Sequence, residues 1–392
     1  MRTSHAGSGL CALLLAAGAV AAPSAPPAWG DALIDQWGLE AVGARDAWPA
    51  VQDEDGGGRG GGATVAVVGT GVDADNPNLG DGVTEGTDFS GADGGAEGAS
   101  TAIAGVAAAT GYGVEHTARF QGVAPDARVL SVRVAPEGGA AGDGDALESG
   151  IRYAADEGAQ VVAVADGVAG GQDMEGVAEA VAYAAHEGTL VLLPAGDPAA
   201  EAASASDGAL TVGPVGRDLS PSQASPSQDA GAIDVYAPGE DVEAPAPGGG
   251  YEQASGSGIA AGFAAGTAAL VRAEHPQLLP DQAAEALTGS AQGGVVNAPA
   301  ALEQAEGAAE DIPLYNEDLV AEDDGLPIPA WTLWAAGGAL VLALLVVLVL
   351  VMRRNAKNPY GLPEREPEDR PGREGAARPS GRRRKGSGRR RK

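Results

Sequence analysis

The stretch from Val65 to Leu79 (VAVVGTGVDADNPNL) has the form of a catalytic strand end, because an apolar run leads directly into a polar turn. Enzymes built from alternating strands and helices place reactive groups at such carboxyl ends. The residue that ends this run is Gly69, which can bend the chain but can neither transfer a proton nor hold a charge. The stretch is therefore either an active site of another design or one whose chemical groups have been removed.

Few other residues could supply acid–base chemistry. Beyond the first 28 residues the chain has three histidines: His116 in a polar stretch, His186 near the end of a predicted helix, and His275 before a proline. We expect all three on the surface. The acidic stretch 73–81 (DADNPNLGD) contains possible calcium ligands, but acidic residues are abundant throughout the chain. We expect no metal and no other cofactor.

The charge of the chain is unevenly distributed. The 392 residues contain 24 Lys/Arg and 54 Asp/Glu, and 15 of these cations but only 5 of these acids lie in residues 353–392. Residues 1–352 therefore hold 9 cations against 49 acids, and all nine cations are arginine. A body this acidic would repel phosphate, which excludes nucleic acid as a partner.

The N-terminal segment predicts export. Residues 10–22 (LCALLLAAGAVAA) follow a cation and precede small residues, which is typical of a secretory signal peptide, here assigned to 1–28. The one cysteine, Cys11, lies inside it, so the mature chain has no thiol chemistry. An N-terminal arm with short helical pieces, ending in a flexible Gly-rich linker, is predicted for 29–62.

The C-terminal segment predicts one membrane anchor. Residues 331–352 carry no charge, begin with two tryptophans in four residues and precede two arginines, as expected for a single transmembrane helix with a cytoplasmic C-terminal side. An acidic, structure-poor spacer (305–330) precedes it. The basic tail (353–392) could bind anionic lipid or act only as a stop-transfer flank. We expect a single-pass protein of the cell membrane whose N-terminal domain is extracellular.

Between these segments, residues 63–304 alternate between apolar strand-like and helix-like stretches. Strands are predicted at 64–69, 127–134, 159–165, 189–195 and 209–215, and helices near 99–109, 145–157, 174–187, 258–274 and from 280. This pattern predicts an α/β fold, with a mostly parallel sheet and helices on both faces. The helix 258–274 has almost no polar side chain along its first twelve residues, so we expect it to be buried on all sides.

Several spaced blocks in this region resemble the subtilisin-like serine proteases (subtilases, peptidase S8). They are VAVVGTGVD, GTDFSGADGG, STAIAGVAAAT, GVAPDARVLSVRV, AIDVYAPGEDV, APGGGYEQASGS and GFAAGTAALVRAEHP. Within the family the resemblance is closest to the mycosins, membrane-anchored subtilases associated with type VII secretion in actinobacteria. It implies a subtilisin-like fold over about 240 residues, because the blocks occur in the family's order.

The resemblance also implies where catalytic groups would stand, and this chain differs at each place. Gly69 stands where the family has the aspartate, Ala99 where it has the histidine, and Gly258 where it has the nucleophilic serine. Asp197 stands where the family has the oxyanion-hole asparagine, and Ala165-Asp166-Gly167 replaces the substrate-pairing Ser-Leu-Gly. Without nucleophile, base and anchoring carboxylate, the triad cannot operate.

These differences predict a catalytically inactive subtilase. By resemblance, it would act as a scaffold or regulator and bind membrane subunits of a type VII secretion complex. Two alternatives remain open. The chain could be an active serine-type endopeptidase with an unorthodox site at Ser255 or Ser257, or a module that binds peptides without cutting them. In the second case Asp166 and Asp197 would favour cationic peptides.

Overall fold

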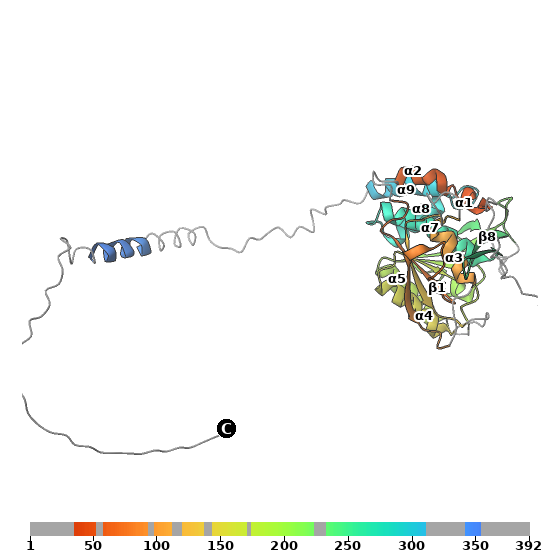
Figure 1. Cartoon of the computed structure of the whole chain (residues 1–392), viewed down its shortest axis with the longest axis horizontal. Coiled ribbons are helices and arrows are strands. Elements are labelled where there is room, and N and C mark those ends of the chain that lie inside the picture. Colours follow the sequence, from red (N-terminus) through yellow and green to blue (C-terminus); the bar gives the residue numbers. More distant parts are fainter. Residues whose placement is uncertain are drawn as a thin grey trace, which may run out of the picture. The chain divides into compact units, whose positions relative to one another are not determined.

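The computed structural model describes residues 35–51, 58–92, 98–111, 120–136, 143–170, 174–222, 233–310 and 342–353. The chain divides into two compact units, Met1–Leu314 and Tyr315–Lys392. All labelled helices and strands in Figure 1 belong to the first unit. The signal-peptide prediction (1–28), His116 and the tail beyond residue 353 lie outside the described residues.

A seven-stranded sheet forms the centre of the first unit, with the order β2-β3-β1-β4-β5-β6-β7 and parallel pairing throughout. Its strands are β1 (Thr64–Gly69), β2 (Val83–Asp88), β3 (Arg128–Arg133), β4 (Val161–Val164), β5 (Leu190–Pro194), β6 (Ala209–Val215) and β7 (Val235–Pro238). The parallel α/β prediction is confirmed. The five predicted strands are all present, each within two residues of the expected ends.

Helices cover both faces of this sheet (Figure 1). They are α1 (Trp37–Ala41), α2 (Ala44–Val51), α3 (Gly98–Ala108), α4 (Gly144–Asp156), α5 (Glu175–His186), α6 (Pro198–Ala203), α7 (Ser257–Glu274), α8 (Pro280–Gly289) and α9 (Ala298–Glu310). Helices α4 and α5 pack together on one face, and α3, α7 and α8 lie on the other. A short 3-10 helix (Gly80–Gly82) precedes β2, and an antiparallel pair, β8 (Val242–Ala246) and β9 (Gly250–Ala254), packs beside α3.

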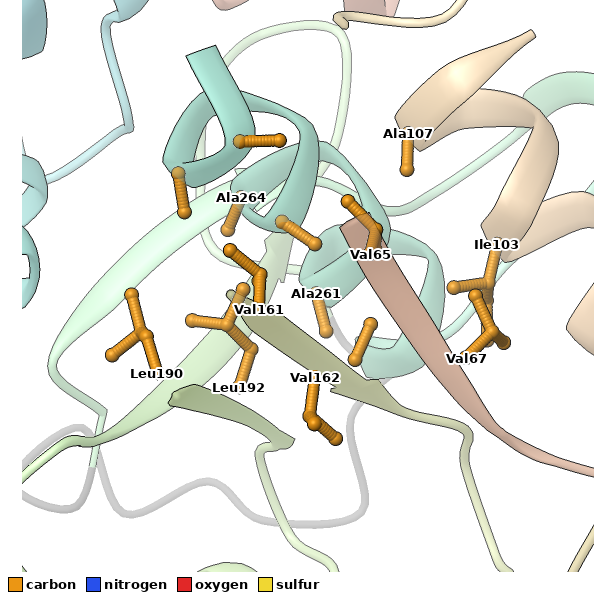
Figure 2. Packing of buried hydrophobic residues seen from close by; sticks show 14 of the residues in the cluster. Val65, Val67, Ile103, Ala107, Val161, Val162, Leu190, Leu192, Ala261 and Ala264 are labelled. Atoms are coloured by element: carbon orange, nitrogen blue, oxygen red, sulfur yellow. The ribbon is translucent and has the colours of Figure 1, made fainter. Parts of the chain in front are cut away.

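Helix α7 is the centre of the core. Every residue from Ser257 to Arg272 is buried, as the sequence predicted, and Ala261 and Ala264 face the apolar side chains of β4 and β5 (Figure 2). Glycine is required where α7 meets α3, because a Cβ on Gly262 would lie 3.0 Å from the carbonyl oxygen of Ile103. The small residues of α7 therefore allow the two helices to pack backbone to backbone.

The N-terminal arm packs on the domain. Its two short helices, α1 and α2, were predicted, and α2 contacts both α7 and α9. Residues 58–62, from the predicted Gly-rich linker, form a turn in the structure. Arg59 donates two hydrogen bonds to the Asp126 carboxylate, at 3.0 and 2.9 Å, and its guanidinium lies over the Trp48 ring. This ion pair ties the turn to the segment before β3.

The C-terminal boundaries also differ from the prediction. Helix α9 continues to Glu310, so residues 305–310, assigned to the acidic spacer, are helical. Leu302 and Ala305 of α9 are buried, which explains why this acidic segment folds. In the second unit, residues 342–353 are helical, whereas 331–341 lie outside the described residues. Among the residues that the structure describes, there is no helix of the length and apolarity needed to span a membrane.

Candidate functional site

The positions singled out from the sequence meet at the carboxyl ends of β1, β4 and β5. A Cβ placed on Gly69, the last residue of β1, would lie 2.8 Å from the Cβ of Ala165, which follows β4. Gly258, in the first turn of α7, lies beside Asp166. Ala99 lies exposed at the start of α3, one residue before Ser100. The parallel sheet thus gathers residues that are far apart in the sequence.

Ser100 occupies the space in front of Gly69. Its side chain is fully buried, and a Cβ on Gly69 would overlap with Ser100 Oγ. The Ser100 hydroxyl accepts a hydrogen bond from the Thr70 N–H at 2.9 Å and shares one with the Thr70 hydroxyl at 3.1 Å. There is consequently no room at the end of β1 for a longer side chain.

Asp166 closes the space in front of Gly258. Its Oδ2 atom accepts a hydrogen bond from the Gly258 N–H at 2.7 Å, and the Ser257 N–H also bonds to this carboxylate. A Cβ on Gly258 would lie 2.7 Å from Asp166 Oδ2 and 2.9 Å from the Asp166 backbone nitrogen. The first turn of α7 presents unpaired N–H groups and the positive end of the helix dipole, which attract a carboxylate. This anion position is therefore filled from within the chain.

Asp197 lines the same pocket as Asp166 and is 7% exposed. It caps α6 by accepting the Ala199 N–H at 2.9 Å. It also accepts the Gly167 N–H at 3.2 Å, and the Ala169 N–H bonds to it as well. Asp197 thus fixes the backbone of the segment that carries Asp166.

The two carboxylates share one electrostatic environment. Burial raises the pKa of Asp166 to about 6; the Gly258 N–H opposes this shift, the Asp197 charge adds to it, and the Ser257 N–H opposes it. Burial also raises the pKa of Asp197, against the hydrogen bonds from Ala199, Gly167 and Ala169. Both carboxylates border a pocket of about 360 Å³. Its lining residues are Asp166, Gly167, Ala169, Ala195, Gly196, Asp197, Pro198, Ser255 and Gly256.

The two serines near Gly258 have structural contacts. Ser257 is fully buried, and its hydroxyl donates to the Ala195 carbonyl at 2.9 Å. The Ser255 hydroxyl accepts from the Asp241 N–H at 2.9 Å. The described histidines lie elsewhere: His186 is exposed at the end of α5, and His275 is the C-cap of α7. Within the described residues, the pocket lining includes no imidazole that could activate either hydroxyl.

In the acidic stretch 73–81, several side-chain oxygens that could bind a metal instead accept hydrogen bonds from backbone N–H groups. Asp73 accepts the N–H groups of Asp75 and Gly248, at 3.1 and 2.7 Å, and Asn76 Oδ1 accepts the Asn78 N–H at 3.0 Å. Part of this stretch borders a larger pocket of about 560 Å³ beside β2 and β3. In the part of the chain that the structure describes, no three His, Cys, Asp or Glu side chains gather as a metal site would require.

The fold and the position of the site define an α/β protein with a parallel sheet and a site at the carboxyl ends of its strands. Residues 60–309 match the family described as the Subtilase family (peptidase S8). This match spans more than half of the chain, and the chain belongs to the subtilase family.

Two curated relatives illustrate this membership. Thermitase of Thermoactinomyces vulgaris is 32% identical over 245 residues, which cover 61% of this chain and 82% of thermitase. An intracellular serine protease of Paenibacillus polymyxa is 32% identical over 230 residues, covering 55% of this chain and 68% of that protein. The name of the second relative describes a serine protease.

Solved mycosin structures are similar in fold. MycP1, described as a serine protease and an essential component of the type VII (ESX-1) secretion system, is 28% identical with a TM-score of 0.54. The match covers 69% of this chain and 89% of MycP1. MycP3 from the type VII (ESX-3) system is 25% identical with a TM-score of 0.52, covering 70% of this chain and 90% of MycP3. The subtilase domain of this chain is therefore mycosin-like in structure.

Proposed function

We propose that this protein is a catalytically inactive, mycosin-like subtilase that works by contact as a scaffold or regulator of a type VII secretion system. The observation that carries the proposal is the hydrogen bond between Asp166 Oδ2 and the Gly258 N–H at 2.7 Å. In a working site of this family, the N–H at this position would stabilise the oxyanion of the tetrahedral intermediate. Here it binds a carboxylate of the chain itself.

The surroundings of Gly69 support the same proposal. Catalysis by a serine requires an imidazole to take its proton and a carboxylate to orient that imidazole. The end of β1 has no room for such a carboxylate, because Ser100 Oγ lies where its Cβ would be. Asp197 would in addition place negative charge where negative charge develops during acyl transfer. These contacts disfavour proteolysis at three separate points.

The alternative of an unorthodox peptidase has less support. Ser257 is fully buried and donates to a carbonyl, and Ser255 receives a backbone N–H. Neither hydroxyl has a basic partner within hydrogen-bond reach in the part of the chain described here, and a serine without one is a weak nucleophile. The peptide-binding alternative is favoured by the 360 Å³ pocket between Asp166 and Asp197, which would suit a cationic side chain.

Purified full-length protein, tested with peptide substrates and a fluorophosphonate probe, separates these functions. We expect no hydrolysis and no labelling, and labelling at Ser255 or Ser257 would establish the unorthodox peptidase instead. Binding of Arg/Lys-rich peptides that weakens with added salt would support the peptide-binding module.

Affinity purification from membranes tests the cellular role. We expect a tagged protein, extracted in mild detergent, to bring with it the membrane subunits of a type VII secretion complex. Residues 331–352 would anchor the protein, with the subtilase domain outside the cell and the tail inside. Recovery of the protein without those subunits, under conditions that keep the complex intact, would contradict the scaffold role.

A further inference from the structure

The turn at residues 217–221, after β6, carries a leucine in a backbone conformation that suits glycine. Leu219 has a φ of +59°, in the left-handed region, where a bulky side chain is an outlier. The Leu219 N–H donates to the Gly216 carbonyl at 2.9 Å, and the Gly216 N–H donates to the Ser220 carbonyl at 3.1 Å. This is the pattern of a three-residue hairpin loop, whose last residue is left-handed and favours glycine. Glycine at position 219 would therefore be less strained than leucine.

The Leu219 side chain also remains largely in solvent. Among the described residues of the first unit, the exposed large apolar residues are Leu219, at 46%, and Leu279, at 58%. Leu279 has an ordinary φ of −73°, so its backbone is not strained. A left-handed conformation raises the free energy of a leucine, and only full burial of the side chain would offset that cost well. Leu219 thus combines strain with apolar surface that its own chain leaves uncovered.

Contacts with the N-terminal arm hold this turn in place. Arg217 donates to the Asp35 carboxylate at 2.6 Å, and its guanidinium lies 5.5 Å from the centroid of the Trp37 ring. The Trp37 Nε1–H donates to the Asp241 carbonyl at 3.2 Å. Asp241 and Leu219 are the two non-glycine residues with positive φ in the part of the chain that the structure describes. Strained residues held by their surroundings occur at binding sites, and a turn that is already ordered loses less entropy when it docks.

The charges beside the turn indicate the chemistry of a partner. Glu240 and Asp218 both lie next to Gly216, because a Cβ there would be 3.2 Å from Glu240 Oε2 and 3.6 Å from Asp218 Oδ1. The docked arm and the β7–β8 segment add three more acids, which are Asp35, Asp241 and Glu243. An apolar centre with an acidic rim is complementary to an apolar pocket bordered by cations. The same rim disfavours an anionic lipid surface and a second copy of this acidic chain.

We propose that the 217–221 turn is a docking element, whose Leu219 side chain enters an apolar pocket bordered by Lys or Arg on a protein subunit of the complex that this scaffold joins. The identity of that subunit rests on the proposed function. The contact itself rests on the strain, exposure and charge of the turn. None of the residues 217–221 lines the 360 Å³ pocket, so the docking element is distinct from the former cleft.

Replacing Leu219 with glycine separates docking from folding. Tagged full-length variants are purified from membranes in mild detergent, and the recovered type VII subunits are quantified by mass spectrometry. Leu219→Gly should lower their recovery about tenfold or more, because the pocket loses the apolar side chain that fills it. The same change should leave the Tm unchanged or raise it by up to about 4 °C, since it removes left-handed strain.

Leu279→Gly is the matched control, because it removes the other exposed leucine of the first unit. It should keep the wild-type recovery. Wild-type recovery with Leu219→Gly would overturn the docking element and leave the proposed function standing. A loss of recovery accompanied by a lower Tm would also overturn it, because Leu219 would then be needed for folding.

Glu240→Lys tests the acidic rim. A cation at this place would face the cations of the partner, so recovery should fall about fivefold or more at low salt. Added NaCl should reduce the difference from wild type. Glu303→Lys makes the same change of charge at an exposed position of α9 and should have little effect. An equal loss in both variants, or a higher recovery with Glu240→Lys, would overturn the cationic pocket.

Photocrosslinking shows what the turn touches. With p-benzoylphenylalanine in place of Leu219, irradiation of membranes should give an adduct with a protein segment that has Lys or Arg beside apolar residues. The same substitution at Leu279 should give no such adduct. An adduct with lipid or with a second copy of the chain, or no adduct, would overturn the proposal. If the wild type recovers no type VII subunit, the proposed function fails, whereas an adduct of the expected chemistry at position 219 would still support the docking element.

Discussion

A double-mutant cycle between Gly69 and Ser100 tests the filled space at the end of β1. Gly69→Ala places a methyl group where it overlaps with Ser100 Oγ and lies 2.8 Å from the Ala165 Cβ. Overpacking a buried site costs about 1–3 kcal/mol, and the less flexible unfolded chain returns up to about 1 kcal/mol. We therefore expect a net loss of about 1–2 kcal/mol. For a domain of this size that is a fall in Tm of about 2–8 °C.

The second arm of the cycle removes the overlapping atom. Ser100→Ala deprives the buried Thr70 N–H of its acceptor, which costs about 1–3 kcal/mol. The Cβ of residue 100 lies 3.5 Å from a Cβ on residue 69, which is an ordinary van der Waals contact. The double variant should therefore be about 1 kcal/mol more stable than the sum of the single losses predicts. It remains less stable than wild type, because the Ala165 contact and the lost hydrogen bond persist.

Thermal unfolding, followed by circular dichroism in one detergent, gives the stability of the full-length wild type, the two single variants and the double variant. Gly307→Ala is the control, because a Cβ there meets nothing within 4 Å and the residue lies in α9. It should raise the stability by up to about 1 kcal/mol. Gly69→Ala unfolding at the wild-type temperature would refute the packing at this site. If the losses in the double variant were strictly additive, Ser100 Oγ would not be the atom that clashes with the Cβ at position 69.

Three further predictions concern the cleft, the arm and the charge of the chain. Gly258→Ser should fail to produce fluorophosphonate labelling and should lower the Tm, because its Cβ meets the Asp166 backbone nitrogen at 2.9 Å; labelling at position 258 would contradict the first expectation and an unchanged Tm the second. Arg59→Ala should cost about 1–2 kcal/mol by thermal unfolding, since it breaks a two-point ion pair with Asp126 and a contact with Trp48, whereas the more exposed Arg217–Asp35 pair should cost less when Arg217 is replaced by Ala. An equal loss of stability in the two variants would contradict the larger contribution expected from Arg59. Because the chain carries a net charge of −30, raising NaCl from about 0.05 to 0.5 M should raise the Tm by screening repulsion, and a lower Tm in high salt would show that attractive ion pairs dominate.

The sequence was most informative where burial alone determines structure. The strands β1, β4 and β5 were predicted because continuous apolar runs in a parallel sheet need no other signal. Strand β2 was missed, since it is a half-exposed edge strand whose polar residues resemble a loop. Helix α9 was also missed: its acidic residues from 305 onward suggested a spacer, and its burial against the domain is a tertiary effect.

The site shows the same division. Sequence comparison with the family pattern indicated Gly69, Ala165, Gly258 and Asp197, and the fold brings them together. It did not indicate that Asp166 turns inward, because the partner is a backbone N–H 92 residues away. Ser100 had a usable signal. The family motif that Ala99-Ser100-Thr101 resembles reads His-Gly-Thr, so a larger residue stands here where the family has glycine, next to the space that a missing side chain at Gly69 would leave. Such paired size changes can be recognised only once the two positions are known to touch.

The filled spaces have a consequence for how the proposed loss of catalysis could be reversed. Gly69 and Gly258 are each blocked by a neighbour, Ser100 and Asp166, that takes part in hydrogen bonds of its own. Restoring one catalytic side chain would therefore lower stability without restoring the triad, because the other members and the free oxyanion position would still be missing. Activity would require the blocking residues to change at the same time. Under the proposal, each single step toward a protease is thus unfavourable, and the inactive state is held by packing as well as by the lack of reactive groups.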